Sequence, residues 1–127
     1  MLSRVADRVY WMARYLERAE SIARITHTFS HLMMDLPKGT EVSWHTLFEI
    51  FEVEQDVINR ALPCGEYEVL DFMIARPENP SSIRYAIKAA RENARTTRDV
   101  LSDEVWESVN ELHIYSREFA EKSVARR

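Results

Sequence analysis

Residues 1–36 contain neither glycine nor proline, and this uninterrupted stretch constrains the fold more than any other feature of the sequence. Glycine and proline are the strongest local breakers of regular structure, and the whole chain has only two glycines and four prolines. Long helices with few connections fit this composition better than many short strands. The stretch predicts a first helix from Ser3 to Met34, with Ser3 as its N-cap and Leu36-Pro37-Lys38-Gly39 as its end.

Two apolar stripes run along this predicted helix when its residues are placed about 100° apart. The first stripe comprises Val5, Val9, Met12, Leu16, Ala19 and Ala23, and the second comprises Trp11, Tyr15, Ile22, Ile25 and Phe29. Because each stripe needs a surface to pack against, the helix is expected to have two neighbours and to lie inside a bundle. Any part of the second stripe that stays uncovered predicts self-association of the chain.

The remaining sequence predicts four more helices. They cover residues 43–62, which share an apolar face and end at a proline, residues 66–75, residues 80–101 with Asn79 as cap and Pro80 at the first helical position, and a last helix that begins after Ser102. The predicted fold class is all-α: one domain over residues 1–127, built as a bundle of about four to five helices with short loops. The polar segment at about 119–127 is expected to fray.

Composition and charge exclude several classes of protein. No apolar run approaches the roughly 20 residues that cross a bilayer, and the N-terminus lacks the apolar region of a secretory signal. A cytoplasmic protein without a membrane partner is therefore expected. The single cysteine allows no intramolecular disulfide. The net charge is −4, which gives no reason to expect a nucleic-acid partner.

Two stretches of the chain carry sequence motifs that are more specific than a helical pattern of apolar residues. The opening stretch reads Leu2-Ser3-Arg4-Val5-Ala6-Asp7-Arg8-Val9-Tyr10-Trp11 and continues through Arg14-Tyr15-Leu16-Glu17-Arg18-Ala19-Glu20. The second contains Asn79-Pro80-Ser81-Ser82-Ile83, Ala89-Ala90-Arg91-Glu92-Asn93-Ala94-Arg95, Arg98-Asp99 and Trp106-Glu107. Both resemble the alpha-E family, of which the chain looks like the N-terminal portion. The resemblance implies an α-helical protein that is often encoded beside ATP-grasp and transglutaminase-like proteins, which form and break amide bonds.

Two clusters of acidic and basic residues are the candidate site. Glu17 and Arg18 carry the Glu-Arg motif of the resembled family, with Glu20 one turn away, and the second cluster comprises Arg91, Glu92, Asn93 and Arg95. Neighbouring residues on a helix diverge by about 100°, so Glu17 and Arg18 cannot grip one ligand as a local pair. We therefore expect each of them to pair across helices in a structural network. Glu20 with Arg24, and Glu17 with Arg14 or Arg24, also have the spacing of neighbours on one helix. The alternative is a polar pocket that holds a ligand or a partner's carboxylate.

Two further patterns have a structural interpretation and a functional one. Five basic residues line one side of the predicted helix 80–101, and an acidic helix at 49–56 is expected to neutralise them; an anionic partner is the alternative. These residues are Arg84, Lys88, Arg91, Arg95 and Arg98. Glu20, His27 and His31 fall within one arc of the first helix, which is a metal-site pattern. The paired Glu-x-x-His elements of bundle metal sites are absent, so no metal and no cofactor is expected.

The sequence contains no nucleophile elbow, Walker loop or His-Glu-x-x-His helix. The first hypothesis is therefore a non-catalytic interaction or substrate-positioning module that works with an ATP-grasp-type peptide or amide ligase, or with a transglutaminase-like protein. The alternative is an enzyme in which the two clusters converge on one cavity and act on a peptide or amino-acid substrate. That cavity would hold Glu17, Glu20, Arg91, Glu92 and Arg95.

Overall fold

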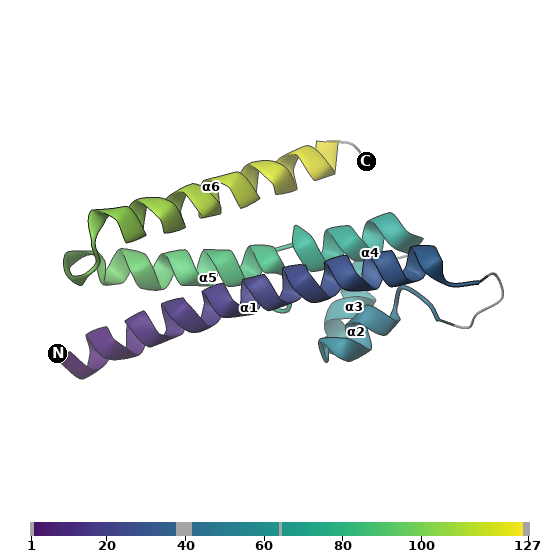
Figure 1. Ribbon diagram of the computed structural model, residues 1–127, viewed down its shortest axis with the longest axis horizontal. Coiled ribbons are helices and arrows are strands. Elements are labelled where there is room, and N and C mark those ends of the chain that lie inside the picture. Colours follow the sequence, from purple (N-terminus) through teal and green to yellow (C-terminus); the bar gives the residue numbers. More distant parts are fainter. Residues whose placement is uncertain (1, 38–41, 64, 126–127) are drawn as a thin grey trace.

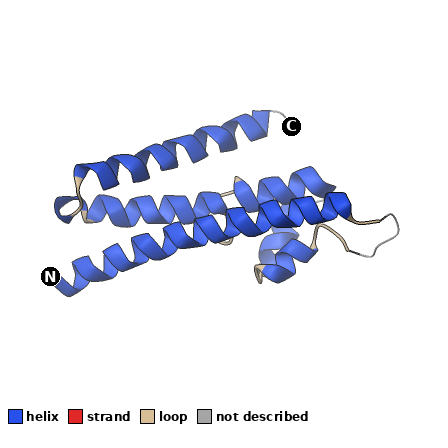
Figure 2. Ribbon diagram, viewed as in Figure 1, coloured by secondary structure: helices blue, strands red, loops and turns tan. Residues whose placement is uncertain are grey.

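The computed structural model describes residues 2–37, 42–63 and 65–125 of the chain. These residues form six α-helices and a short 3₁₀ turn, η1, without a strand in the described ranges (Figure 2). The helices are α1 (Leu2–Asp35), α2 (Thr46–Ile50), α3 (Gln55–Ala61), α4 (Gly65–Ile74), α5 (Ile83–Thr96) and α6 (Asp103–Ala125), and η1 is Arg98–Val100. The predicted all-α class is confirmed, with one or two helices more than expected.

Figure 1 shows how the long helices are arranged. The N-terminal half of α1 packs against α5, and α6 packs against α5 on the side away from α1. Helix α4 lies near the start of α5, roughly in line with it, and runs along the C-terminal half of α1. Helices α2 and α3 lie below that same half of α1 in the view of Figure 1. Within the described residues, no helix is long and apolar enough to cross a membrane.

The predicted helix at 43–62 is wrong, because it is two short helices separated by a turn. Helix α2 ends in a Schellman motif: the N–H of Glu52 donates to the Glu49 carbonyl at 3.2 Å, and that of Val53 donates to the Phe48 carbonyl at 2.9 Å. This motif needs a left-handed residue, and Glu52 takes that position with φ of 51°. Glycine is the usual residue there, so a glutamate gave no sign of the break.

A main core lies between the C-terminal half of α1 and helices α2 to α4. Its buried residues are Ile22, Phe29, Leu47, Phe48, Val57, Val69, Phe72 and Met73. The second apolar stripe of α1 therefore packs against neighbouring helices, as predicted, but only along part of its length. Trp11 and Ile25, which belong to the same stripe, remain 45% and 38% exposed.

Small residues bring α1 and α5 together at the other end of the bundle. Ala86, Ala90 and Ala94 of α5 are fully buried, and they pack against Met12 and Ala19 of α1. These alanines recur every four residues and so lie on one face of α5. The stretch 89–95 that resembles the family thus contains two of the residues that set the approach of the two helices.

The segment 79–82 is a turn that precedes α5 rather than its first residues. Ser82 is the N-cap: its Oγ accepts from the Tyr85 N–H at 3.1 Å and donates to the Arg76 carbonyl at 2.6 Å. Asn79, fully buried, donates from Nδ2 to the Phe72 carbonyl at 3.1 Å and accepts from the Ser81 N–H at 3.0 Å. The predicted roles of Asn79 and Pro80 at the helix start are therefore wrong, and this family-like stretch fastens α4 to α5.

The C-terminal part of the predicted helix 80–101 also differs from the prediction. Helix α5 ends at Thr96, and η1 and a short bend separate it from α6. Ser102 accepts a hydrogen bond from the Val105 N–H at 3.2 Å, as a helix cap does. The segment after residue 118, where fraying was expected, is helical as far as Ala125.

Candidate functional site

The acidic residues of both clusters pair within their own helices. In α1, Arg14 Nη1 lies 3.1 Å from Glu17 Oε2, and Arg24 pairs with Glu20 one turn away. In α5, Arg95 Nε donates to Glu92 Oε2 at 3.2 Å. All these partners are more than half exposed. The local pairs Glu17–Arg14 and Glu20–Arg24, which helical spacing offered, are confirmed, whereas the expected pairing of the acidic residues across helices is wrong. Exposed pairs of this kind contribute little to stability.

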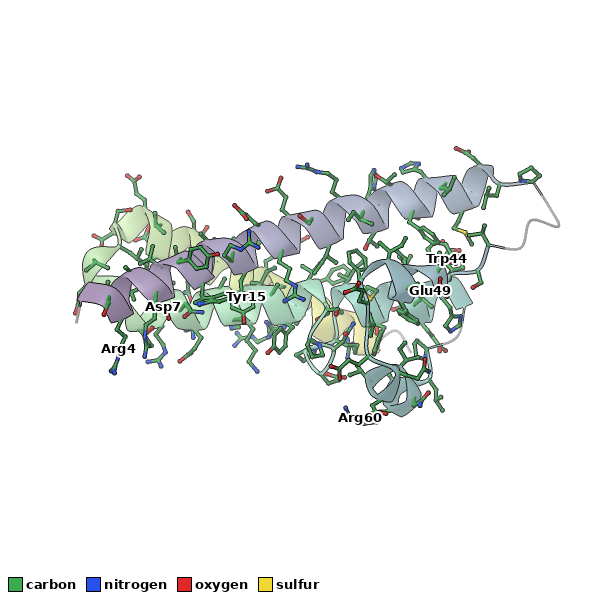
Figure 3. The ribbon with its side chains drawn as sticks, turned by 90° about the horizontal axis from the view of Figure 1, so that it is seen from below. Arg4, Asp7, Tyr15, Trp44, Glu49 and Arg60 are labelled. Atoms are coloured by element: carbon green, nitrogen blue, oxygen red, sulfur yellow. The ribbon has the colours of Figure 1, made fainter. Side chains whose placement is uncertain are left out.

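Glu17 and Arg18 border an open depression along α1. The depression has a volume of about 310 Å³, and its lining also includes Trp11, Arg14, Tyr15 and Ser21. Tyr15 reaches toward α5 (Figure 3) and packs on its buried alanines, while its ring lies 6.0 Å from that of Trp11. An indole, a phenol ring and two guanidinium groups thus surround one patch that is open to solvent.

The second cluster does not form a single site. Arg95 holds Glu92 through a hydrogen bond that lowers the pKa of this carboxyl group, and the charges of Arg95, Arg91 and Arg8 lower it further. Asn93 donates to the Ala89 carbonyl of its own helix at 3.0 Å. Arg91 instead turns toward α6, where its Nε donates to Asn110 Oδ1 at 3.1 Å. The cluster is therefore divided between the surface of α5 and the α5–α6 seam.

The seam between α5 and α6 is rich in arginine. Arg84 and Arg91 are seven residues apart on α5, a spacing that returns to the same side of a helix after two turns, and Arg98 follows in η1. The guanidinium carbons of Arg91 and Arg98 lie 5.6 and 4.8 Å from the centre of the Trp106 ring. Part of the predicted basic stripe thus packs against α6, where cation–π contacts replace the expected acidic helix at 49–56.

Arg84 is the most deeply buried of these three arginines, with 7% of its surface exposed. Its Nη1 lies 3.3 Å from His113 Nδ1 and 3.4 Å from Ser116 Oγ, both on α6. Desolvation, followed by the charges of Arg84 and other nearby cations, lowers the pKa of His113 from 6.5 to about 4. The imidazole is therefore neutral at pH 7, and its Nδ1 can accept a hydrogen bond from Arg84.

This shift predicts that acid weakens the fold. Between pH 6.5 and about 4 the unfolded chain binds a proton at residue 113 and the folded chain does not, so stability falls as the pH falls through this window. After allowance for solvent screening, we expect a loss of about 1 kcal/mol. Urea titrations at pH 7 and pH 4.5 should show a smaller pH dependence for His113→Gln. Equal dependence in His113→Gln and in His31→Gln, an exposed control, would contradict the assignment.

His27 and His31 lie close together, but Glu20 does not join them. The two rings are 4.5 Å apart, edge to face, on the exposed side of α1, whereas Glu20 is paired with Arg24. Among the residues that the structure describes, no three His, Cys, Asp or Glu side chains are grouped as metal ligands. His27 is exposed and does not lie at the edge of the core.

Sequence reasoning missed two features of these surfaces. Trp11 and Tyr15 were assigned only to an apolar stripe, and Tyr15 does pack against the core, but both residues also border the Glu17–Arg18 depression. Their position at the boundary between the apolar stripe and the polar side of α1 was the available signal. His113 gave no local signal, because its environment depends on Arg84, which is 29 residues away in the chain.

Comparison with known protein families matches residues 1–126 to the Alpha-E model, described as a predicted alpha-helical domain with a conserved ER motif. Glu17-Arg18 is a Glu-Arg pair in the part of the chain that this match covers. Searches of curated proteins and of solved structures found no match.

Proposed function

The chain belongs to the Alpha-E family, and on that premise we propose that it is a non-catalytic helical module that binds a protein partner through the depression along α1. One observation carries the proposal: Glu17 and Arg18 lie at an open surface beside a 45% exposed tryptophan, not around an enclosed cavity. Tryptophan, tyrosine and arginine are the residues most enriched at the energetic centres of protein interfaces. All three occur in this depression.

The charges of the depression indicate the chemistry that it recognises. Arg14 and Arg18 offer guanidinium groups, which bind carboxylates in a bidentate way. Glu17 already pairs with Arg14, so Arg18 is the group better placed to receive a carboxylate from a partner. Trp11 supplies the apolar area beside it. A partner segment with an acidic side chain next to an apolar or aromatic one would match this arrangement.

The partner that we propose is an ATP-grasp-type peptide or amide ligase, or a transglutaminase-like protein, acting in the cytoplasm. This choice follows from the resemblance to a family whose members are often encoded beside such proteins. In this role the module would position a peptide substrate or dock the ligase itself. The enzyme alternative needs both charged clusters around one cavity, whereas Glu17, Glu20 and Glu92 pair with neighbours on their own helices.

The test is capture of the partner with surface variants of the full chain. We expect tagged wild-type protein to recover an ATP-grasp or transglutaminase-like protein from its host, identified by mass spectrometry. Trp11→Ala and Arg18→Glu should each weaken binding of the purified partner at least about tenfold, because each removes one main contact. Both positions are exposed, so the variants should remain folded by circular dichroism.

Arg60→Glu is the matched control, because it reverses an exposed arginine on α3. Figure 3 places Arg60 well away from Tyr15, which lines the depression. Retained binding in this control, together with loss in Arg18→Glu, would support the proposed site. Equal binding by all three variants would reject the α1 depression. The absence of either kind of partner would reject the proposed ligase association.

A further inference from the structure

An apolar groove lies between α6 and the junction of α4 with α5. Its volume is about 230 Å³, and apart from Ser116 its lining is apolar: Ile74, Ile83, Ile87, Leu112, Tyr115 and Phe119. The three residues from α6 other than Ser116 are well exposed, with Leu112 at 41%, Tyr115 at 69% and Phe119 at 46%. None of these residues borders the depression along α1, so the groove is a separate surface.

The apolar residues of α6 have the spacing of a helix-packing seam. Val105, Leu112 and Phe119 are seven residues apart, and Tyr115 lies between the last two at three and four residues. This is the a and d pattern with which one helix packs against another. Val109 and Ser116, on the adjacent side of α6, already face α5. The a and d stripe therefore lies beside the α5 contact, and within the described residues no helix covers it.

A row of acidic residues follows the outer edge of this stripe. Glu104, Glu111 and Glu118 each come directly before a stripe residue, so they share one flank of α6 at seven-residue spacing. All three are exposed, and no ion pair joins them to another residue in the part of the chain that the structure describes. In a helix pair, residues on this flank select the partner by charge.

This charge pattern argues against a second copy of the chain as the occupant. A two-fold symmetric pair brings the same patch of both copies together. Two copies of α6 in antiparallel contact would therefore place glutamate beside glutamate, which is unfavourable. A helix with basic residues at the matching positions would instead form ion pairs along the whole flank.

We propose that the groove binds an amphipathic helix of a partner protein that carries an apolar stripe and a row of lysine or arginine residues beside it. The apolar stripe of that helix would cover Leu112, Tyr115 and Phe119 above the floor of Ile83 and Ile87. Its basic row would face Glu104, Glu111 and Glu118. The bundle would then have two separate binding surfaces, one on α1 and one on α6.

The test uses two synthetic amphipathic peptides of about three heptads, with leucine at the a and d positions. One carries lysine along the flank, and the other carries glutamate at the same positions. Isothermal titration with the full chain should show the lysine peptide binding at least about tenfold more tightly. Glu111→Lys combined with Glu118→Lys should reverse this preference. Glu104 stays unchanged, because it stabilises the first turn of α6.

A second pair of variants tests the apolar part of the groove. Tyr115→Ala should weaken binding of the lysine peptide at least about tenfold, whereas Tyr67→Ala, which removes a half-exposed tyrosine from α4, should not. Trp11→Ala should bind the peptide as the wild type does, which separates this result from that of the α1 surface. Failure of both peptides to bind, or no response to the charge reversal, would overturn the proposal.

Light scattering of the chain without peptide tests whether a second copy of the chain fills the groove. A monomer that binds the lysine peptide agrees with the proposed occupant. A dimer that Tyr115→Ala converts to a monomer would show that a second copy fills the groove, and this would also overturn the proposal.

Discussion

Replacing Asp71 with alanine is expected to lower the free energy of unfolding by about 3 kcal/mol, because it removes a buried carboxylate that pairs with Arg76. The side chain of Asp71, on α4, is 1% exposed, and that of Arg76 is 15% exposed. Arg76 Nε lies 3.1 Å from Asp71 Oδ2 as an ion-pair contact, and a longer hydrogen bond runs from Nη2 to Oδ1 at 3.5 Å. The Arg76 carbonyl also receives the hydrogen bond of the α5 cap.

The prediction is checked by urea denaturation followed by circular dichroism, with Asp56→Ala as the control. Asp56 is an exposed acid on α3, so its replacement should cost less than about 1 kcal/mol. Replacing the pair together, Asp71→Leu with Arg76→Met, should recover most of the loss, because an apolar pair needs no counter-charge. Equal losses in Asp71→Ala and Asp56→Ala would show that the ion pair is unimportant.

Helical periodicity predicted the long helices well, because their apolar residues repeat over many turns. The first helix was placed within one residue at each end, and α4 within one residue. The error at 43–62 arose because the apolar pattern continues across the break. What ends α2 is the backbone conformation of Glu52, which forms because Leu47, Phe48 and Val57 all reach the same core. The position of that core is set by α1 and α4, not by the sequence around Glu52.

The sequence identified the charged residues of the candidate site and the local partners of Glu17 and Glu20, but not the contacts that the arginines of α5 make with α6. Glu17, Glu20 and Glu92 have arginines three or four residues away, and these local pairs form without any constraint from the rest of the fold. Arg84 and Arg91 instead contact α6, because those residues face the seam rather than solvent. To predict which arginines contact α6, one must know where α6 lies around α5, and helical periodicity alone does not provide this.

Replacing Ala90 with leucine is expected to destabilise the protein by about 2 kcal/mol, through overpacking of the α1–α5 contact. Ala86, Ala90 and Ala94 have no exposed surface, and Met12 packs directly against the last two. The longer side chain therefore has no solvent to enter. Either α1 must shift away from α5 or the leucine must leave its preferred rotamer, and both cost free energy.

Thermal denaturation should show the melting temperature of Ala90→Leu lowered by about 8 °C, at about 4 °C for each kcal/mol in a domain of this size. Ala89→Leu is the matched control, because it makes the same change at the next residue, which is only partly buried. We expect its melting temperature to stay within about 2 °C of the wild type. A loss for Ala90→Leu no larger than the control's would mean that α1 and α5 are not held together by this row of alanines. The helix spacing would then depend on larger side chains in the contact, such as Met12.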